Sequence, residues 1–370
     1  MRIAHVVTYL SVDGAFGGPI SVALAQAEEL ARRGHEVELL AGWDGRAELP
    51  ESLVHHRLFR VHRVGPGFVG LASPHLWLYL LRNRDRYDAV HIHLGRDLIT
   101  LAAARLGLGG ARKVVVQTHG MIMPRSRAAV RLVDCLATRR VLDGADTVLV
   151  LTDDERRGVA GLTRDPSRIR TVANGVPSPA WTPRCEDDGR PVVMFLARLH
   201  PRKRVLAFAR MAALLVAAGC PADFEIIGPD QGDLPALRAY LAEHGLGGRV
   251  RYRGVVPQGG ARAEMQRASV YVLPSVGEVF PMTVLEAMSA GTPAVLTADC
   301  GIAQELRDRG AATVTDGSPE ALASAVIALL ADSEFRARQL ACADEALRDW
   351  LSVEAVVDRL ETVYCAAQRS

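Results

Sequence analysis

The sequence predicts an α/β protein of two Rossmann-like domains, each with a parallel β-sheet and crossover helices. Strand and helix patterns alternate along most of the 370 residues, which is typical of parallel sheets. A segment rich in proline and turn formers follows Asn174, and the alternation then restarts. We therefore expect one domain over residues 1–175 and another over 190–350, facing each other across a cleft, with 176–190 as the linker.

Buried strands are predicted where apolar and β-branched residues run together. In the first half these segments are 2–8, 36–41, 89–93, 114–118, 147–151 and a short 169–172. In the second half they are 192–196, 224–227, 249–253, 270–273 and 294–297. Helices are expected between the strands, for example over 20–33, and a final amphipathic helix is expected over 353–367.

Composition and charge are those of an ordinary globular enzyme, with 49% hydrophobic and 23% charged residues. A formal net charge of +2 is too small to indicate a nucleic-acid partner. No stretch approaches the roughly 20 apolar residues that span a membrane, and the N-terminus is expected to begin a strand, not a signal peptide. The six cysteines form no CxxC pair, which argues against a zinc site or a disulfide framework and favours a reducing cytoplasm.

Residues 274–293 carry the most informative pattern, because two glutamates flank a predicted helix start. Glu278 lies in a turn after a buried strand, and Glu286 lies in the following helix, for which Pro281 is the expected first residue. Free amides over 280–283 would then form an anion site. The two carboxylates can accept hydrogen bonds from hydroxyls on either side of a bound diphosphate. On spacing alone, solvated surface charge is the competing interpretation.

A basic segment follows the first strand of the second domain and is expected to face the cleft. It contains Arg198, Arg202, Lys203 and Arg204. A guanidinium binds phosphate through two donors, and an ammonium acts as a point charge. These cations predict a positive wall for a diphosphate, with a solvated basic turn as the alternative.

A glycine-rich turn follows the first strand and precedes a helix. Gly17 and Gly18 would let the backbone approach a ligand closely. Their spacing is not that of the dinucleotide fingerprint, so simple turn geometry is an equal alternative.

Histidines also lie at the ends of predicted strands in the first half. His119 follows the strand at 114–118 with Gly120 beside it, which favours a role at the cleft. On the strand at 89–93, His91 is interpreted as packing and His93 as a weaker cleft residue.

The segment Arg125–Arg140 is basic, with arginines at 125, 127, 131, 139 and 140. Leu132 and Leu136 interleave with them. An amphipathic helix with a charged outer face is the simpler interpretation. The sharper one is a patch on the acceptor side, or at a membrane surface, that attracts phospholipid or pyrophosphate head groups.

Together these motifs resemble the retaining glycosyltransferases of the GT-B fold, and most closely family 4, the group 1 transferases. Glu278 and Glu286 match the family's two-glutamate motif, and Arg198 with Lys203 matches its Gly-Arg-Leu…Lys segment. Further matches are Gly17-Gly18, Thr118-His119-Gly120 and Asn174-Gly175-Val176. Departures, at Ala173, Ala197, Arg204 and Val279, concern loop detail and donor preference.

The resemblance implies a role for each matching position. Arg198 and Lys203 would neutralise the diphosphate of a UDP- or GDP-linked sugar, so that no metal and no other cofactor is required. Glu286 would hold the ribose and Glu278 the donor sugar. His119 would stabilise charge on the reacting sugar. The further donor-binding positions would be Gly17, Gly18, Gly254, Val255, Phe280, Pro281, Met282 and Thr283.

The implied reaction is transfer of a sugar to an acceptor hydroxyl with retention of configuration, and the helix at 352–370 would return to the first domain. The segment after His119 resembles bacterial surface and exopolysaccharide transferases, whose acceptors are glycans or lipid-linked sugars. This resemblance implies a cytoplasmic enzyme at the inner face of the membrane. The alternatives are a tailoring transferase for a soluble small molecule, a nucleotide-sugar epimerase and a non-catalytic nucleotide-sugar binder.

Overall fold

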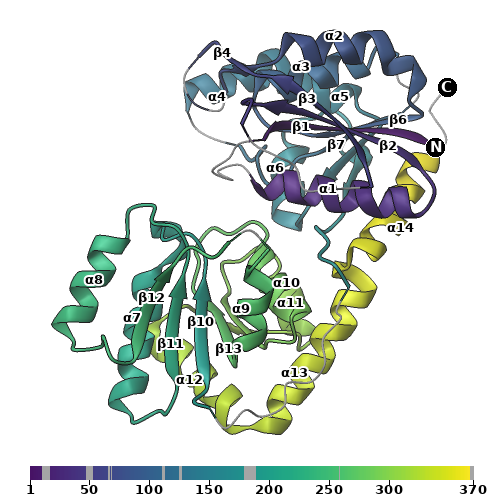
Figure 1. Cartoon of the computed structure of the whole chain (residues 1–370). Coiled ribbons are helices and arrows are strands. Elements are labelled where there is room, and N and C mark those ends of the chain that lie inside the picture. The colour runs from purple at the N-terminus through teal and green to yellow at the C-terminus, as the bar shows by residue number, and fades with distance from the viewer. Residues whose placement is uncertain are drawn as a thin grey trace. The chain divides into compact units, whose positions relative to one another are not determined.

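The computed structural model describes residues 1–10, 17–46, 53–65, 67, 69–110, 113–124, 127–178, 189–257 and 259–366 (Figure 1). The chain divides into two compact units, which are Met1–Gly175 with Val353–Ser370 (unit 1) and Val176–Ser352 (unit 2). Two parallel sheets flanked by helices confirm the predicted fold class. Among the helices described, each is too short or too polar to cross a membrane.

The sheet of unit 1 has seven parallel strands in the order β3-β2-β1-β6-β7-β8-β9. They are β1 Arg2–Leu10, β2 Glu36–Trp43, β3 His55–Arg60, β6 Ala89–His93, β7 Val114–Gln117, β8 Thr147–Val150 and β9 Ile169–Thr171. β4 (His62–Arg63) and β5 (Leu71–Ala72) form a separate antiparallel pair. The edge strand β3 was not predicted, because its polar, largely exposed sequence lacks the apolar run of a buried strand.

Two helical layers cover this sheet (Figure 1). On one face lie α1 (Gly17–Arg32) and α14 (Val353–Cys365), and on the other lie α2 (Pro74–Asn83), α3 (Leu98–Gly107), α5 (Arg139–Gly144) and α6 (Asp153–Ala160). The predicted position of Gly17 and Gly18 in a loop is wrong, because both belong to the first turn of α1. Pro19 is compatible with this early helix start, because the first-turn amides have no intrahelical partner.

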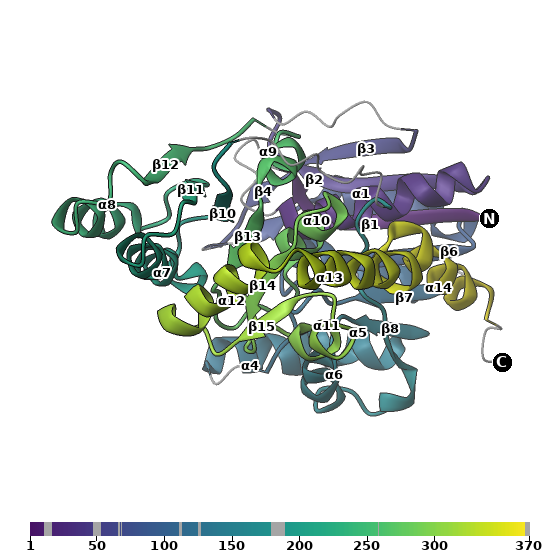
Figure 2. The same cartoon turned by 90° about the horizontal axis from the view of Figure 1, so that it is seen from below.

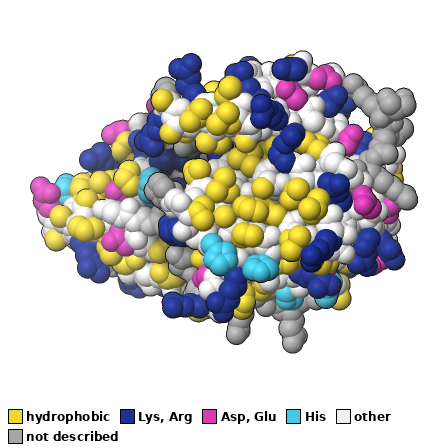
Figure 3. Space-filling model, turned by 90° about the horizontal axis from the view of Figure 1, so that it is seen from above, with side chains coloured by type: hydrophobic (Ala, Val, Ile, Leu, Met, Phe, Trp, Pro, Cys, Tyr) yellow, Lys and Arg dark blue, Asp and Glu magenta, His cyan; other side chains and the backbone are white. Residues whose placement is uncertain are grey.

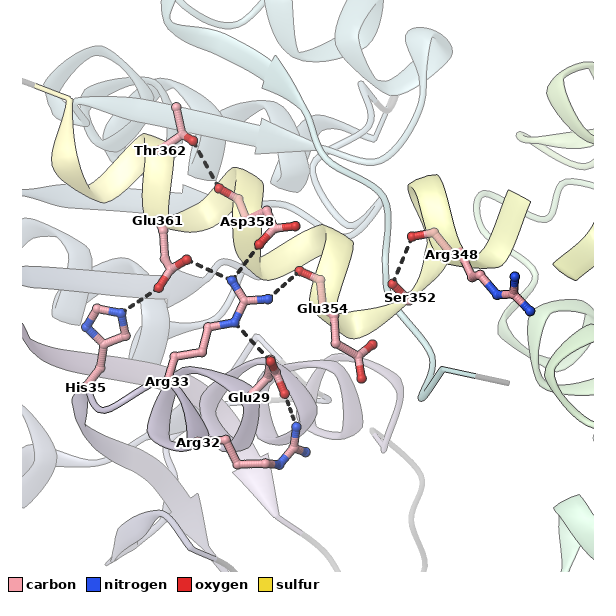
Figure 4. A network of polar contacts seen from close by, with 10 residues as sticks. All are labelled: Glu29, Arg32, Arg33, His35, Arg348, Ser352, Glu354, Asp358, Glu361 and Thr362. Carbon is pink, nitrogen blue, oxygen red and sulfur yellow. Dashed lines mark hydrogen bonds and ion pairs between the residues drawn. The ribbon is translucent and has the colours of Figure 1, made fainter. Parts of the chain in front are cut away.

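Arg33 and His35, which follow the end of α1, bind the C-terminal helix α14 (Figure 4). The Arg33 guanidinium donates to the carboxylates of Asp358 at 2.6 Å and Glu361 at 2.8 Å, and to the carbonyl of Glu354 at 2.9 Å. It also pairs with Glu29 of α1 at 2.9 Å. An apolar face of α14 packs into the hydrophobic core to which α1 also contributes, through Val353, Val356, Val357, Leu360 and Tyr364.

The sheet of unit 2 has six parallel strands in the order β12-β11-β10-β13-β14-β15. They are β10 Val192–Leu196, β11 Asp223–Ile227, β12 Val250–Gly254, β13 Val270–Leu273, β14 Ala294–Thr297 and β15 Thr313–Thr315. Its helices are α7 Val205–Ala217, α8 Leu234–Glu243, α9 Ala261–Arg267, α10 Met282–Ser289, α11 Ala303–Asp308, α12 Pro319–Ala331 and α13 Ser333–Ala346. Figure 2 follows the C-terminal segment through α13 into α14.

The first and the last residue of unit 2 pair with each other beside the predicted linker. Val176 forms a parallel bridge with Ser352, and its amide donates to the carbonyl of Leu351 at 2.9 Å. Of the linker predicted over 176–190, residues 179–188 lie outside the described part of the chain.

Both sheets reverse their strand order once, between β1 and β6 in unit 1 and between β10 and β13 in unit 2. In open α/β sheets, ligands bind at the carboxyl ends of the strands beside such a reversal. In unit 2, this position is formed by the segments that follow β10 and β13. They contain Arg198, Lys203 and Glu278.

Candidate functional site

An ion pair joins the two segments at the strand-order reversal of unit 2. The Lys203 Nζ lies 2.5 Å from the Glu278 Oε2, and the two side chains are only 15% and 18% exposed. The resemblance implied phosphates as partners of the ammonium and a sugar as the partner of the carboxylate, and the structure brings these two groups together. Each neutralises the other in a sparsely solvated position.

The segment that carries Glu278 is held on both sides. The Gly301 amide donates to the carbonyl of Glu278 at 2.8 Å, and the Gly277 amide donates to the Asp299 carboxylate at 2.5 Å. The Arg202 guanidinium donates to the carbonyl of Gly277. Arg202 therefore holds this loop in place.

The segment after β10 contains a strained residue. Arg204 has φ 52° and ψ 47°, the left-handed conformation, immediately before α7 begins. For a residue other than glycine this costs about 1–3 kcal/mol. The Lys203 amide donates to the His200 carbonyl at 2.7 Å and closes the turn. The strained backbone therefore fixes the direction of the Lys203 side chain.

Arg198 lies one residue beyond a close backbone contact. A Cβ on Gly228 would lie 1.9 Å from the carbonyl oxygen of Ala197, so only glycine fits there. The Arg198 side chain is exposed, and among the residues described it has no ion-pair or hydrogen-bond partner. It is therefore available to an incoming anion.

The helix start after Glu278 differs from the prediction. Pro281 has φ −84° and ψ 79°, and α10 begins at Met282, so Pro281 precedes the helix instead of opening it. The Met282 amide donates to the carbonyl of Phe280 at 3.1 Å, which forms a tight turn. Within the described part of the chain, the amides of Phe280 and Thr283 have no hydrogen-bond partner, as an anion site requires.

Glu286 lies in α10 without a cationic partner among the residues described. Burial raises the pKa of its carboxyl group to about 7. Nearby, the Tyr271 hydroxyl donates to the Thr283 hydroxyl at 2.8 Å and is also 3.1 Å from the Leu196 carbonyl. This contact ties the first turn of α10 to the end of β10.

The turn after β12 is an exposed segment of the chain. Gly254 ends the strand with φ 77°, where glycine is favoured, and Val255 is 65% exposed. The Gly254 carbonyl accepts a hydrogen bond from the Gly228 amide at 2.8 Å, which links this turn to the segment next to Ala197.

In unit 1, His119 adopts a left-handed backbone with φ 49°. A buried carboxylate, that of Glu155, stabilises this turn. It accepts hydrogen bonds from the Thr118 hydroxyl at 2.5 Å, the Gly120 amide at 2.5 Å and the Leu151 amide at 2.8 Å. Burial raises the pKa of Glu155. Sequence reasoning missed it, and the only signal was a Thr152-x-x-Glu155 pattern, which is typical of a helix cap.

The His119 imidazole ends a chain of hydrogen-bonded histidines. The His93 Nδ1 lies 2.7 Å from the His119 Nε2, and the His93 Nε2 lies 3.1 Å from the His5 Nδ1. His91 stacks on His93 with ring centroids 4.7 Å apart, and its Nδ1 lies 2.6 Å from the hydroxyl of Tyr364. The predicted cleft position of His93 is wrong, because its side chain is buried.

Burial keeps these imidazoles neutral. It lowers the pKa of His5 and of His119 to about 3, and it lowers the pKa of His91 and of His93 well below the ordinary value. A buried imidazolium without a counter-ion would be strongly disfavoured. Unit 1 thus presents uncharged donors and acceptors beneath His119.

Among the described residues, His5, His91 and His93 form the one group of three side chains close enough to hold a metal ion. Both nitrogens of His93 already have imidazole partners. The rings of His91 and His93 are stacked and inclined by only 13°, so their lone pairs lie in two nearly parallel planes and do not meet at one point between the rings. This arrangement suits stacked neutral rings better than tetrahedral ligation.

Comparisons with known proteins agree with the geometry. Residues 17–175 match the glycosyl transferase 4-like domain, and residues 190–332 match the glycosyl transferases group 1 family. A D-inositol 3-phosphate glycosyltransferase of Thermomonospora curvata is 26% identical, over 99% of this chain and 83% of the relative. One from Mycobacterium avium is 27% identical, over 68% of this chain and 58% of the relative.

Solved structures show the same fold. HepE of Anabaena, in complex with UDP and glucose, aligns with a TM-score of 0.72 at 18% identity, over 99% of this chain and 100% of that one. The sucrose-phosphate synthase of Thermosynechococcus elongatus aligns with a TM-score of 0.70 at 18% identity, over 98% of each chain.

Proposed function

Since this chain belongs to the group 1 glycosyltransferases of the GT-B fold, we propose that it transfers a sugar from a nucleotide-diphosphate sugar to an acceptor hydroxyl with retention of configuration. The observation that carries the proposal is the strand-order reversal of unit 2. There Arg198 is unpaired, and Lys203 is paired with Glu278 at 2.5 Å. A diphosphate supplies the negative charge that these cations need.

The donor would be held by groups of opposite character. Arg198, Lys203 and the amides of Phe280 and Thr283 would bind the diphosphate. Once Lys203 turns to the phosphates, the carboxylate of Glu278 becomes free to accept hydrogen bonds from the sugar hydroxyls. Glu286 would accept from the ribose diol, and the base would lie against the Gly254-Val255 backbone.

The reaction would follow from positioning and electrostatics. The acceptor oxygen bonds to the anomeric carbon on the face from which the diphosphate leaves, and a phosphate oxygen takes the acceptor's proton. Arg198 and Lys203 would stabilise the charge on the leaving group. His119 would face the positive charge that develops on the sugar through its backbone carbonyl, and the open start of α1 at Gly17-Gly18 would admit the sugar phosphate.

The proposed reaction needs no divalent metal, because cationic side chains and amides would neutralise the diphosphate. The supporting observation is the exposed Arg198, whose side chain has no ion-pair partner among the described residues. Turnover in excess EDTA should equal that of untreated enzyme, and loss of activity restored by a divalent cation would refute this part of the proposal.

One experiment tests the donor and the stereochemistry together. We would screen nucleotide-diphosphate sugars by thermal shift, because a ligand at a hundred times its Kd stabilises by about 2.7 kcal/mol. The UDP complex of the HepE neighbour favours UDP over GDP as the first nucleotide to test. NMR of the product would then report the anomeric configuration, and inversion would rule out the retaining mechanism. Conversion of the donor to an epimer without an acceptor would indicate an epimerase instead.

The acceptor that we propose is a glycan or a lipid-linked sugar in polysaccharide or glycolipid assembly. A surface of unit 1 supports membrane contact. Leu132 and Leu136 are 59% and 56% exposed, and the exposed arginines around them are Arg127, Arg131, Arg139 and Arg140. Figure 3 shows a face of the protein on which hydrophobic side chains lie among Lys and Arg. Arg125, predicted as part of this patch, lies outside the described residues.

Binding to vesicles tests this surface. The protein should co-sediment with anionic phospholipid vesicles and not with zwitterionic ones, and the L132S/L136S double variant should bind less. Leu214, exposed on α7 of unit 2, provides a matched control through Leu214→Ser. Failure to bind either vesicle type would favour the second candidate, a small polar acceptor, which the names of the inositol 3-phosphate transferase relatives also suggest.

A further inference from the structure

Four histidines form a polar column inside the apolar core of unit 1. His5 of β1 and His91 of β6 are partners in the register of the sheet. His93 lies two residues further along β6, on the same face, and His119 follows the end of β7. Most other residues of this face are apolar, and α1 and α14 cover them. Two buried polar residues also lie on it, Gln117 of β7, which is the register partner of His93, and Thr147 of β8. The column leads from the core to the turn at His119.

The hydrogen bonds of the column have a preferred direction. A neutral imidazole has one donor nitrogen and one acceptor nitrogen. At one end of the column, the His119 Nε2 faces the His93 Nδ1 at 2.7 Å. At the other end, the His5 Nε2 has no hydrogen-bond partner among the described residues, and this end decides the direction.

The protons then follow in sequence. If the His119 Nε2 is an acceptor, the His93 Nδ1–H must donate to it, and the His93 Nε2 must accept from the His5 Nδ1–H. The His5 Nε2 has no partner among the described residues and is left as a bare lone pair. The opposite direction would leave it as a buried N–H without an acceptor, which is the rarer defect in proteins.

We infer that His5 and His93 are positioning residues, which hold His119 as the Nδ1–H tautomer and thereby fix the carbonyl of its left-handed turn against the reacting sugar. This inference rests on the proposed transferase function for its effect on rate, but not for the tautomer itself. His119 would then act in the reaction through its backbone, while its imidazole serves as the anchor.

His91 provides the matched control. It is as buried as His93, lies on the same strand and face, and stacks on the His93 ring. Its hydrogen bond, however, runs to Tyr364 of α14 at 2.6 Å and not to His119. A substitution at this position therefore perturbs the same core without breaking the hydrogen bonds that run from His5 through His93 to His119.

The first test uses steady-state kinetics of the full chain. His93→Asn keeps a donor near the Nδ1 position, whereas His93→Gln places its amide near the Nε2 position and removes the donor to His119. We expect His93→Gln to lower kcat about tenfold, which corresponds to about 1.4 kcal/mol for one buried hydrogen bond, with little change in the donor KM. His93→Asn should retain most of kcat, and His91→Gln should lower Tm and leave kcat near that of the wild type.

The second test needs no donor. In full-length protein labelled with ¹⁵N-histidine, long-range ¹H–¹⁵N spectra distinguish the two tautomers, and His119→Gln identifies the His119 signals. We expect His119 as Nδ1–H in the wild type and in His93→Asn, and a mixture of tautomers in His93→Gln.

Several results would overturn the inference. These are a charged or Nε2–H His119 in the wild type, a tautomer that His93→Gln does not change, equal losses of kcat in the three variants, or stoichiometric zinc in the purified protein. If the wild type transferred no sugar from any donor, the proposed function would fail, while the spectra would still decide the tautomer of His119.

Discussion

The two sheets share a strand order, but charged side chains lie at the strand-order reversal of unit 2 and neutral side chains at that of unit 1. Unit 2 places the charged pair of Lys203 and Glu278 at its strand-order reversal, 2.5 Å apart. Unit 1 places neutral imidazoles at the corresponding edge, ending at His119. A ligand with permanent negative charge suits the first, and a charge that exists only during reaction suits the second. Topology thus selects where a site forms, and side-chain electrostatics decide what it does.

The largest predicted effect is that mild acid moves the stability of the two units in opposite directions. The folded-state pKa of His5 and His119 is lowered to about 3, below the unfolded value of about 6.5, so their contribution is lost as pH falls below 6.5. One such histidine contributes roughly 5 kcal/mol over the full window. Glu286, with a raised pKa of about 7, contributes most below its unfolded value and loses this as pH rises through 7.

Hydrogen exchange on the full chain can separate these responses. Between pH 7 and pH 5, after correction for intrinsic rates, β1 and β6 should lose protection while α10 gains it. Asp97 and Glu155 of unit 1 have raised pKa values and act in the sense of Glu286, but four histidines oppose them. Parallel changes in both units would remove the electrostatic contrast between them.

The next effect concerns the contribution of Arg198, a residue of unit 2, to turnover. Arg198→Ala should lower kcat by about 10²–10³, the range for loss of one preorganised electrostatic contact in a transition state. The side chain is exposed, so we expect the variant to fold normally. Arg251→Ala, which removes another exposed arginine of the same unit, should leave kcat unchanged. A wild-type kcat in Arg198→Ala would exclude this residue from stabilisation of the leaving group.

The sequence predicted the sheets well, for a physical reason. Parallel strands buried on both faces are continuous apolar runs, so Ala89–His93, Val192–Leu196, Val270–Leu273 and Ala294–Thr297 were bounded correctly. The ends of these runs then located the segments of Arg198 and Glu278. The short β15 (Thr313–Thr315) was not predicted, because its three residues are partly exposed and form no such run.

The supporting contacts could not be predicted from the sequence. Glu155 looks like a helix-cap residue, and only the fold shows that its carboxylate reaches the turn at His119. His5 and His93 are 88 residues apart, and their contact depends on the pairing of β1 with β6. Pro281 has a strong preference for the first helical position, but the turn between Phe280 and Met282 prevails locally.

The third prediction concerns the turn at His119. Glu155→Ala should destabilise unit 1 by about 1–3 kcal/mol, because it leaves the partly buried amide of Gly120 and the buried amide of Leu151 unpaired. Glu155→Gln can keep one acceptor and should cost less. Asp154→Ala, an exposed change in the same helical turn, is the control in urea unfolding. Identical unfolding midpoints for Glu155→Ala and Asp154→Ala would mean that the Glu155 carboxylate does not stabilise the turn at His119.

A smaller effect is expected on the pH dependence of donor binding. The pKa of Glu286 is about 7 in the free protein, and the ionised carboxylate is the form that accepts from a ribose diol. Each pH unit below 7 should therefore raise the donor KM by up to about tenfold, and the KM should level off above pH 8. Glu286→Gln should flatten this profile, and an unchanged profile in that variant would remove Glu286 from the ribose site.

The smallest effect tests how unit 1 is completed by the helix that follows unit 2. Arg33 is 24% exposed as a side chain and pairs with Asp358 and Glu361 of α14 (Figure 4). Partly exposed pairs contribute about 0–1 kcal/mol, so Arg33→Ala should lower the protection of α14 in hydrogen exchange by roughly that amount. Arg32→Ala, whose ion pair with Glu29 stays within α1, should leave α14 unchanged. Equal behaviour of the two variants would mean that Arg33 does not hold α14, and that its apolar face and its other polar contacts, such as that of Glu361 with His35, suffice to hold the helix.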